Sequence, residues 1–237
     1  MTTPAPTLTH TPTPTSTTTA TPTAIPTQTA TVLPTVVATC PAERVLDVPL
    51  IPQERPLSCE FAAMRMVLAT LLGRAPTEDE VMSCVPRDAN PHFGFRGDPG
   101  GRNRNADGSI NWENYGVYAP AVASALNACF LGPNGKFEAI AATGVTYSEV
   151  ADSILHGYPV IVWVATGQPE TVGLHTPEGE ITLVAGEHVW VVYGYHANNT
   201  FDVLDPYPVK SGRRLLARQA FPNWRLFENM AVFIVPQ

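Results

Sequence analysis

The sequence predicts an α+β domain, with helices in the first half of the folded region and strands in the second. Two observations carry this prediction. Between residues 58 and 157 apolar residues recur at helical spacing. From residue 157 onward, short runs rich in β-branched and aromatic residues are separated by Gly, Asn and Pro. Helices followed by strands, rather than an alternation of the two, are typical of α+β architecture.

The N-terminal segment differs from the rest of the chain. Its first 39 residues contain 17 Thr and 7 Pro and no charged residue. Such a composition cannot bury a core, and it is typical of extended stalks outside the cell. We therefore expect a disordered Thr/Pro-rich linker over residues 1–42, a folded domain over 43–237, and an extracytoplasmic or cell-surface location. The N-terminus lacks the pattern of a signal peptide, and the nature of any anchor stays open.

Charge and hydropathy exclude several classes of partner. The formal net charge is −7, with only 14 Lys and Arg, which argues against nucleic acid as a partner. The longest apolar runs, such as "YPVIVWVA", are too short to span a bilayer. The oligomeric state is left open by these properties.

The first predicted helix runs from Ser58 to Leu72. Phe61, Met64 and Leu68 recur at helical spacing, Gly73 provides a stop, and we expect Ser58 to cap the first turn. Cys59 then lies in that first turn.

Further helices and the strands follow from local signals. Thr77-x-x-Glu80 and Thr146-x-x-Glu149 each predict a capping box at the start of a helix. The helix that begins at Thr146 should end near Gly157. The segment "AVASALNACF" predicts another helix. The predicted strands are "PVIVWVA", "HVWVVYGYH", "TFDVLD" and "MAVFIV".

Residues 88–116 form a long predicted loop, a kind of segment that is often functional. Within it, residues 103–114 resemble a calcium-binding loop, but Asn103 and Asn114 stand where carboxylates are normally needed. A loop closed by Asx hydrogen bonds is the alternative interpretation.

The cysteines are Cys40, Cys59, Cys84 and Cys129, and none forms a CxxC pair, so we expect no zinc site. In an oxidising compartment a Cys84–Cys129 disulfide is a candidate. Apart from the calcium-like segment, no sequence pattern indicates a metal or another cofactor, and we expect none.

Cys59 has the chemistry of a nucleophile, because the first turn of a helix lowers the pKa of a thiol. His188 opens one strand and Asp205 closes the next, so antiparallel pairing brings them together. Asp205 would orient His188, which would exchange the proton of Cys59. The side-chain amide of Gln53 is a candidate oxyanion donor.

Gln53-x5-Cys59 at a helix start, followed by a strand-borne His and a strand-end Asp-Pro, resembles the papain-fold cysteine peptidases. More narrowly, the segments "VPLIPQERPLSCEFAAMRMVL", "GFRGDPGG", "YGVYAPAVASAL", "GEHVWVVYGYH" and "VLDPY" are similar to peptidase family 39, the bacteriocin-processing leader peptidases, in its stand-alone type. The resemblance implies a papain-like fold, cofactor-free hydrolysis of peptide or protein substrates, and a bacterial source. It implies Cys59 as nucleophile, His188 as base and acid, Asp205 as orienter and Gln53 in the oxyanion hole.

One departure from the leader-processing type bears on activity. Ser58-Cys59-Glu60 stands in place of the usual Asp-Cys-Gly, and Glu60 should raise the pKa of the thiol. Two alternatives therefore remain: a peptidase-like binding module without activity, and an amidase or transpeptidase that uses the same triad. His92 and His175 lie in segments that can flank the cleft, and each of the four candidate residues also has a purely structural interpretation.

Overall fold

The computed structural model of the chain describes residues 42–165, 167–208, 212–217 and 221–237. Nearly all of the predicted linker, together with Cys40, lies outside these residues. The strands are β1 Arg44–Val45, β2 Phe137–Ala142, β3 Val160–Ala165, β4 Thr171–Thr176, β5 Gly179–Val184, β6 Glu187–His196, β7 Thr200–Asp205, β8 Gly212–Ala217 and β9 Ala231–Pro236. The helices are α1 Cys59–Leu72, α2 Glu78–Cys84, α3 Ala119–Leu126 and α4 Tyr147–His156, with a π-helix over Asn127–Leu131 and a 3₁₀ helix over Trp224–Phe227.

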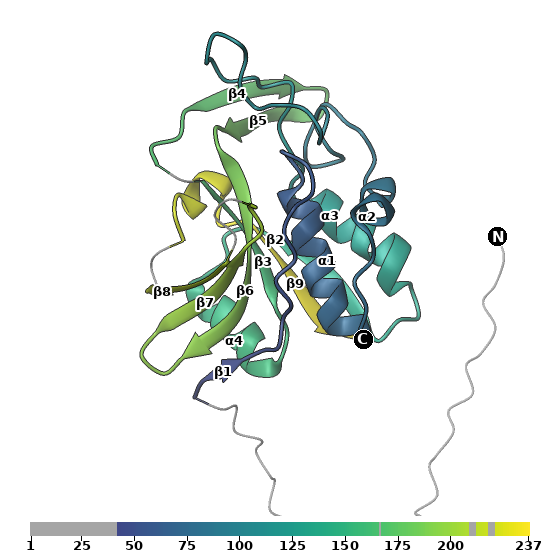
Figure 1. Cartoon of the computed structure of the whole chain (residues 1–237), viewed down its shortest axis with the longest axis vertical. Helices are drawn as coiled ribbons and strands as arrows, with labels where there is room; N and C mark the ends of the chain where they lie inside the picture. Colours follow the sequence, from purple (N-terminus) through teal and green to yellow (C-terminus); the bar gives the residue numbers. More distant parts are fainter. Residues whose placement is uncertain (1–41, 166, 209–211, 218–220) are drawn as a thin grey trace, which may run out of the picture. The chain divides into compact units, whose positions relative to one another are not determined.

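An antiparallel sheet in the order β2-β9-β3-β6-β7-β8 forms the centre of the domain, and β1 also pairs with β6. β4 and β5 form a separate hairpin (Figure 1). In Figure 1 this hairpin lies at the top, beyond the N-terminal end of β6, which is the next strand in the chain. Strands β6 and β7 are consecutive and paired, as expected from the sequence.

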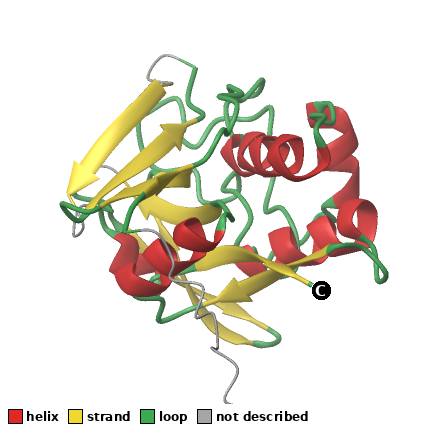
Figure 2. Cartoon of the chain, turned by 90° about the horizontal axis from the view of Figure 1, so that it is seen from below, coloured by secondary structure: helices red, strands yellow, loops and turns green. Residues whose placement is uncertain are grey.

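Helices cover both faces of the sheet, as Figures 1 and 2 show. Side chains of β3 and β6 alternate between two cores. Trp163, Val189 and Val191 pack in the core with α1 and α3, whereas Val162, Trp190 and Val192 pack in the core with α4. Both faces of the central strands are therefore buried, which explains their nearly continuous apolar sequences.

The predicted helix boundaries at Gly73 and at the two capping boxes are confirmed, whereas the helix predicted over residues 121–130 begins at Ala119 and continues from Asn127 as a π-helix. α1 ends where Gly73 adopts a left-handed conformation (φ 71°), and both capping boxes form, at Thr77 and at Thr146. Ser58, however, does not cap α1. Its hydroxyl accepts a hydrogen bond from the N–H of Arg55 and donates one to the carbonyl of Arg55, so it stabilises the preceding turn instead.

Several strands were not predicted from the sequence. β2, "FEAIAA", has the composition of a helix, but it pairs along its whole length with β9 at the other end of the domain. The hairpin β4–β5 is half-buried and does carry the apolar alternation of a strand: Val172, Leu174, Ile181 and Leu183 pack on the core and alternate with exposed residues. The pairing partner, rather than local propensity, therefore determines the structure of β2, whereas the signal of the hairpin was present in its sequence and was missed.

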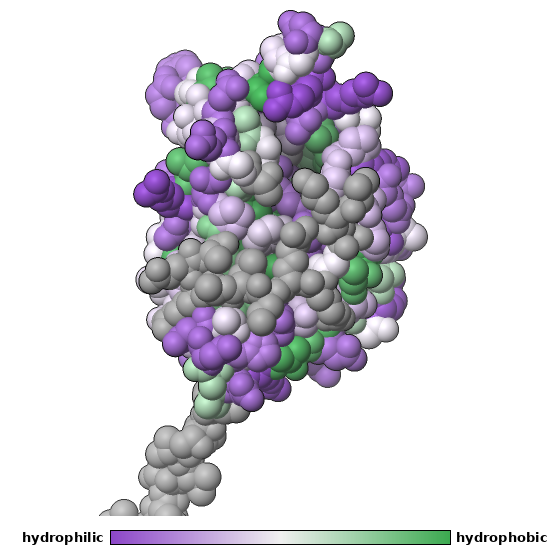
Figure 3. All heavy atoms as spheres, turned by 60° about the vertical axis from the view of Figure 1, so that its left-hand side comes forward, coloured by the Kyte–Doolittle hydropathy of each residue, from purple (hydrophilic) through white to green (hydrophobic). Residues whose placement is uncertain are grey.

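The candidate disulfide is confirmed: Cys84 at the end of α2 is bonded to Cys129 in the π-helix. Among the described residues Cys59 is the one free cysteine. No helix in the described part of the chain is long and apolar enough to cross a membrane. On the face drawn in Figure 3, the coloured hydrophobic residues form small separate groups among hydrophilic ones.

Candidate active site

Cys59 is the first residue of α1, and its side chain is buried. The segment before it is fixed to the long loop, because the N–H of Leu57 donates to the carbonyl of Pro99 at 3.0 Å. The first N–H groups of a helix lack partners within the helix and carry partial positive charge. The helix therefore favours the thiolate form of Cys59.

A buried carboxylate holds the loop that carries Gln53. Glu78 accepts the backbone N–H of Glu54 at 2.8 Å and the guanidinium of Arg55 at 2.9 Å, and its side chain is fully buried. This bracing sets the position of the loop relative to α1, which follows it directly.

His188 and Asp205 are brought into direct contact by the pairing of β6 with β7. Nε2 of His188 lies 2.8 Å from Oδ1 of Asp205, and both side chains are largely buried. Oδ1 of Asp205 also accepts the N–H of Tyr207 at 3.0 Å, which fixes the carboxylate. With Nε2 bonded to the carboxylate, Nδ1 is the nitrogen left for proton exchange.

Gln53 is buried and lies at the same site, but its amide is already engaged. Nε2 donates to the carbonyls of Arg55 (2.8 Å) and Pro56 (3.0 Å), so both amide hydrogens are used. Oε1 is buried without a hydrogen-bond partner among the described residues. The backbone N–H of Gln53 donates to the carbonyl of Pro206, which ties this loop to the segment after Asp205.

The four predicted residues line one pocket of about 220 Å³. It lies between the start of α1 and the β6–β7 pair, and the long loop contributes Asn103 to its wall. Its lining residues are Gln53, Pro56, Leu57, Cys59, Asn103, Tyr115, Gly186, Glu187, His188, Asp205 and Tyr207.

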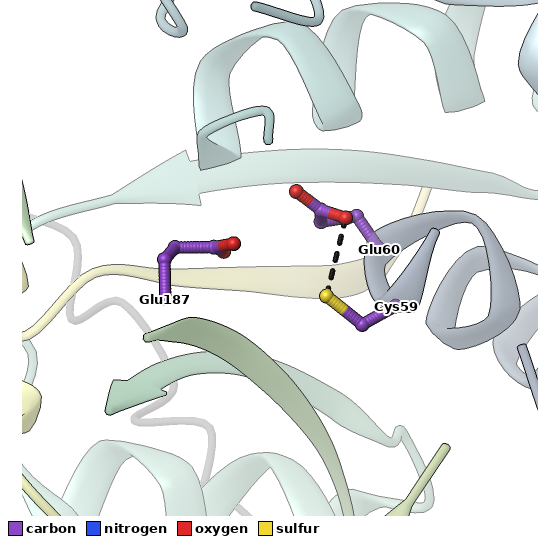
Figure 4. A group of neighbouring side chains, drawn as sticks. All are labelled: Cys59, Glu60 and Glu187. Atoms are coloured by element: carbon purple, nitrogen blue, oxygen red, sulfur yellow. Dashed lines mark hydrogen bonds between the residues drawn. The ribbon is translucent and has the colours of Figure 1, made fainter. Parts of the chain in front are cut away.

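The thiol of Cys59 donates its hydrogen bond to a carboxylate rather than to His188. Sγ lies 3.3 Å from Oε2 of Glu60, whose Oε1 accepts the N–H of Val117 at 2.6 Å. Glu187, at the start of β6, points toward both residues (Figure 4). One ligand atom from each of Cys59, Glu60 and Glu187 lies within 4.8 Å of the others.

Burial controls the ionisation of this group. It raises the pKa of the Cys59 thiol well above its usual value, and the neighbouring charges of Glu60 and Glu187 raise it further. Burial likewise raises the pKa of Glu60 to about 7 and that of Glu187 well above its usual range. Glu60 thus raises the pKa of the thiol, as expected from the sequence, although burial is the larger cause.

Sequence reasoning found the four predicted residues and Glu60 but missed Glu187. Glu187 stands next to His188, and the strand alternation places it on the face of β6 that carries Val189, toward α1. An acidic residue opening an otherwise apolar strand was the available signal.

The other histidines that the structure describes do not line the pocket. His196 ends β6 and pairs with Asp202 at 2.8 Å, and His175 pairs with Glu180 on the exposed face of the hairpin. In the calcium-like segment, Asp107 accepts hydrogen bonds from the N–H and hydroxyl of Ser109. That segment therefore has the closed, Asx-bonded geometry of the alternative interpretation.

Comparisons with known proteins agree with this arrangement. The model of the Peptidase_C39 like family matches residues 45–232. Among solved structures, a Bacillus anthracis protein described as a C39-like peptidase is 22% identical, covers 82% of this chain and 98% of its own, and superposes with a TM-score of 0.65. The papain-like α+β fold is thereby confirmed.

Two further solved structures are similar over most of the chain. The peptidase domain of Streptococcus ComA, a bi-functional ABC transporter of a quorum-sensing pathway, is 20% identical (80% of this chain, 99% of that one, TM-score 0.47). Xylellain, a cysteine protease from Xylella fastidiosa, is 13% identical (84% and 87%, TM-score 0.42). No curated protein matches the chain significantly in sequence.

Proposed function

The chain belongs to the Peptidase_C39 like family, and on that premise we propose that it hydrolyses peptide bonds with a Cys59-His188-Asp205 triad. The observation that carries the proposal is the 2.8 Å bond between His188 and Asp205 in the pocket that also holds Cys59. The bond leaves Nδ1 of His188 to exchange the proton of Cys59.

The reaction begins with a change in the partner of the thiol. Cys59 turns about χ1 from Glu60 toward His188, and the thiol proton passes to Nδ1. The thiolate attacks the carbonyl carbon of the substrate, and the electron pair of the C=O bond moves to oxygen. Asp205 stabilises the imidazolium that forms.

The tetrahedral intermediate needs donors for its oxyanion. We assign this role to the backbone N–H of Cys59 and to the amide of Gln53, which must exchange one of its two carbonyl partners for the oxyanion. Collapse then breaks the C–N bond, and His188 gives its proton to the leaving amine. Water, deprotonated by His188, hydrolyses the thioester and restores the free thiol.

A peptide-binding module without hydrolytic activity is the second candidate, and the hydrogen bond from Cys59 to Glu60 favours it. A thiol held by a carboxylate in a buried site is protonated more readily than one paired with an imidazole. An amine in place of water at the last step would make the same triad an amidase or transpeptidase.

The test compares the full chain with Cys59→Ala, His188→Gln and His196→Gln variants on a mixture of peptides, with products identified by mass spectrometry. His196 has a matched His–Asp pair outside the pocket, so its variant controls for loss of a structural histidine. We expect cleavage by the wild type and the His196 variant, and a loss of about 10³-fold or more in the other two. Cleavage that survives in Cys59→Ala, or a wild type that binds peptides and cleaves none, would reject the peptidase.

We also propose an extracytoplasmic location for the domain. The disulfide between Cys84 and Cys129 supports it, because such bonds persist in oxidising compartments. Mass spectrometry of the protein from its native cells, alkylated before lysis, tests the proposal: both cysteines should escape the reagent.

A further inference from the structure

Three potential metal ligands meet at the inner end of the active-site pocket. Sγ of Cys59, an oxygen of Glu60 and an oxygen of Glu187 lie within 4.8 Å of one another. In Figure 4 the carboxyl group of Glu187 points toward the other two side chains, and one oxygen of Glu60 faces the sulfur. The closest pair, Sγ and Oε2 of Glu60, is 3.3 Å apart. Cys59 and Glu187 also line the pocket, which gives an ion a path from solvent.

Both carboxyl groups pack directly against the backbone of Gly116. A Cβ atom on Gly116 would lie 2.5 Å from Oε1 of Glu60 and 2.7 Å from Oε2 of Glu187. Gly116 does not have a positive φ, so its backbone conformation does not call for glycine. The missing side chain instead allows the two carboxyl groups to approach the same point of the backbone, and so brings them together.

One ligand of this group lacks a partner. Oε1 of Glu187 is buried and accepts no hydrogen bond from any residue that the structure describes. Within the same part of the chain, no Lys, Arg or His forms an ion pair with Glu60 or Glu187. A buried carboxylate oxygen without a donor is costly, and a bound cation would remove that cost.

We propose that Cys59, Glu60 and Glu187 bind a thiophilic divalent cation of the zinc class, with a water molecule from the pocket as the fourth ligand. Thiolate and carboxylate ligands suit Zn²⁺, and a thiolate disfavours Mg²⁺ and Ca²⁺. A tetrahedral site with Zn–S near 2.3 Å and Zn–O near 2.1 Å places its ligand atoms about 3.4–3.6 Å apart. The Cys59–Glu60 pair, at 3.3 Å, is slightly closer than this separation, and a rotamer change of Glu187 brings its oxygen within the same range.

Binding releases the thiol proton, and any carboxyl proton, to solvent, and it forms a metal–sulfur bond without a change of oxidation state. The bound ion occupies the electron pair with which Cys59 would attack a substrate. The site is thus a reversible block of the nucleophile. This consequence rests on the proposed function, whereas the metal site itself does not.

The experiment measures metal binding directly. Full chain carrying Cys40→Ser, which leaves Cys59 as the cysteine outside the disulfide, is titrated with Cd²⁺ while the ultraviolet thiolate-to-cadmium charge-transfer band is recorded. Zn²⁺ is then titrated in competition with a chromophoric chelator. We expect saturation at one ion per chain, no charge-transfer band in Cys59→Ser, and at least about tenfold weaker binding in Glu187→Gln.

Two further variants make the result specific. Glu180→Gln, on the exposed face of the hairpin, removes a carboxylate elsewhere and should leave the affinity unchanged. Gly116→Ala places a methyl group against both carboxyl groups, displaces them and should weaken binding. Circular dichroism establishes that each variant is folded. Alkylation by iodoacetamide establishes that the thiol of Cys59 is accessible in the variants that retain it.

Absence of binding by the wild type, or equal affinity of the wild type and Glu187→Gln, would overturn the metal site. Its failure is distinguishable from that of the peptidase, because the titration needs no substrate. Metal binding by a protein that cleaves no peptide even in EDTA would reject the peptidase alone, and cleavage that Zn²⁺ does not inhibit would reject the block of the nucleophile.

Discussion

The nucleophile candidate of this protein stands between two opposing influences. The first turn of α1 favours a thiolate at Cys59, whereas burial and the carboxylate of Glu60 favour the protonated thiol. The side chain of Glu60 is fixed next to the thiol, because its second oxygen accepts a hydrogen bond from the N–H of Val117 at the end of the long loop. The residue that weakens the nucleophile therefore also fixes part of the pocket wall.

Replacing Glu60 by Gln should make Cys59 more reactive near neutral pH. The substitution removes the negative charge next to the thiol but retains a side chain that can bind the N–H of Val117 through its amide oxygen. We expect the pH profile of iodoacetamide alkylation, measured in EDTA, to move to lower pH, because the charge of Glu60 raises the pKa of the thiol. A profile that stays in place would show that the charge of Glu60 does not control the thiol.

At the residue level, spacing along the chain predicted which side chains would share a pocket. The order Gln53, Cys59, His188, Asp205 was sufficient, because a helix start and two paired strand ends have a definite geometry. The position of Glu187 was not predictable in this way. It depends on how β6 is turned relative to α1, which is a tertiary property that no local pattern encodes.

The elements of the fold differ in how far their own sequences determine them. α2 and α4 begin at capping boxes that are complete within four residues, so both starts were predicted correctly. Ser58 has the same residue type at a helix start, yet its hydroxyl bonds to Arg55 in the turn before α1. A cap is thus determined by the conformation of its flanking turn as well as by the residue itself.

The capping box of α4 provides a quantitative test at this scale. Thr146 accepts the N–H of Glu149 with its hydroxyl, and Glu149 in turn accepts the N–H of Thr146. Thr146→Ala should lower the free energy of unfolding by about 1 kcal/mol. Thr146→Ser keeps the hydroxyl and should stay within a few tenths of that of the wild type, as measured by urea denaturation; equal losses in the two variants would contradict a role for the cap.

Over the whole molecule, the α+β class was predictable but the order of the strands was not. The runs that form β3, β6, β7 and β9 are apolar enough to be recognised alone. β2 forms a strand because it pairs with β9, which lies nearly a hundred residues later in the chain. Contacts of this separation depend on the assembled core and are invisible to any local window of sequence.

Two acidic side chains in the domain make its free energy of unfolding depend on pH in an unusual direction. Burial raises the pKa of Glu60 from 4.5 to about 7, and it raises that of Glu187 well above 4.5. A carboxyl group whose pKa is raised by folding stabilises the folded state fully below its unfolded pKa. That stabilisation is lost as the pH rises through the folded value. The free energy of unfolding should therefore decrease between pH 5 and pH 8.

We expect a decrease on the order of 2 kcal/mol in the wild type, measured by urea denaturation in EDTA, and a smaller one in Glu187→Gln. The variant removes one of the two neighbouring acids, the partly buried Glu187, and the repulsion between them. His92, whose pKa burial lowers, acts in the opposite direction below pH 6.5, but it is present in both proteins and cancels in the difference. Exposed carboxylates such as Glu149, whose pKa is lowered by its cap, titrate below this window. Equal slopes in the two proteins would mean that Glu187 is ionised throughout, and its burial would then need a permanent cationic partner.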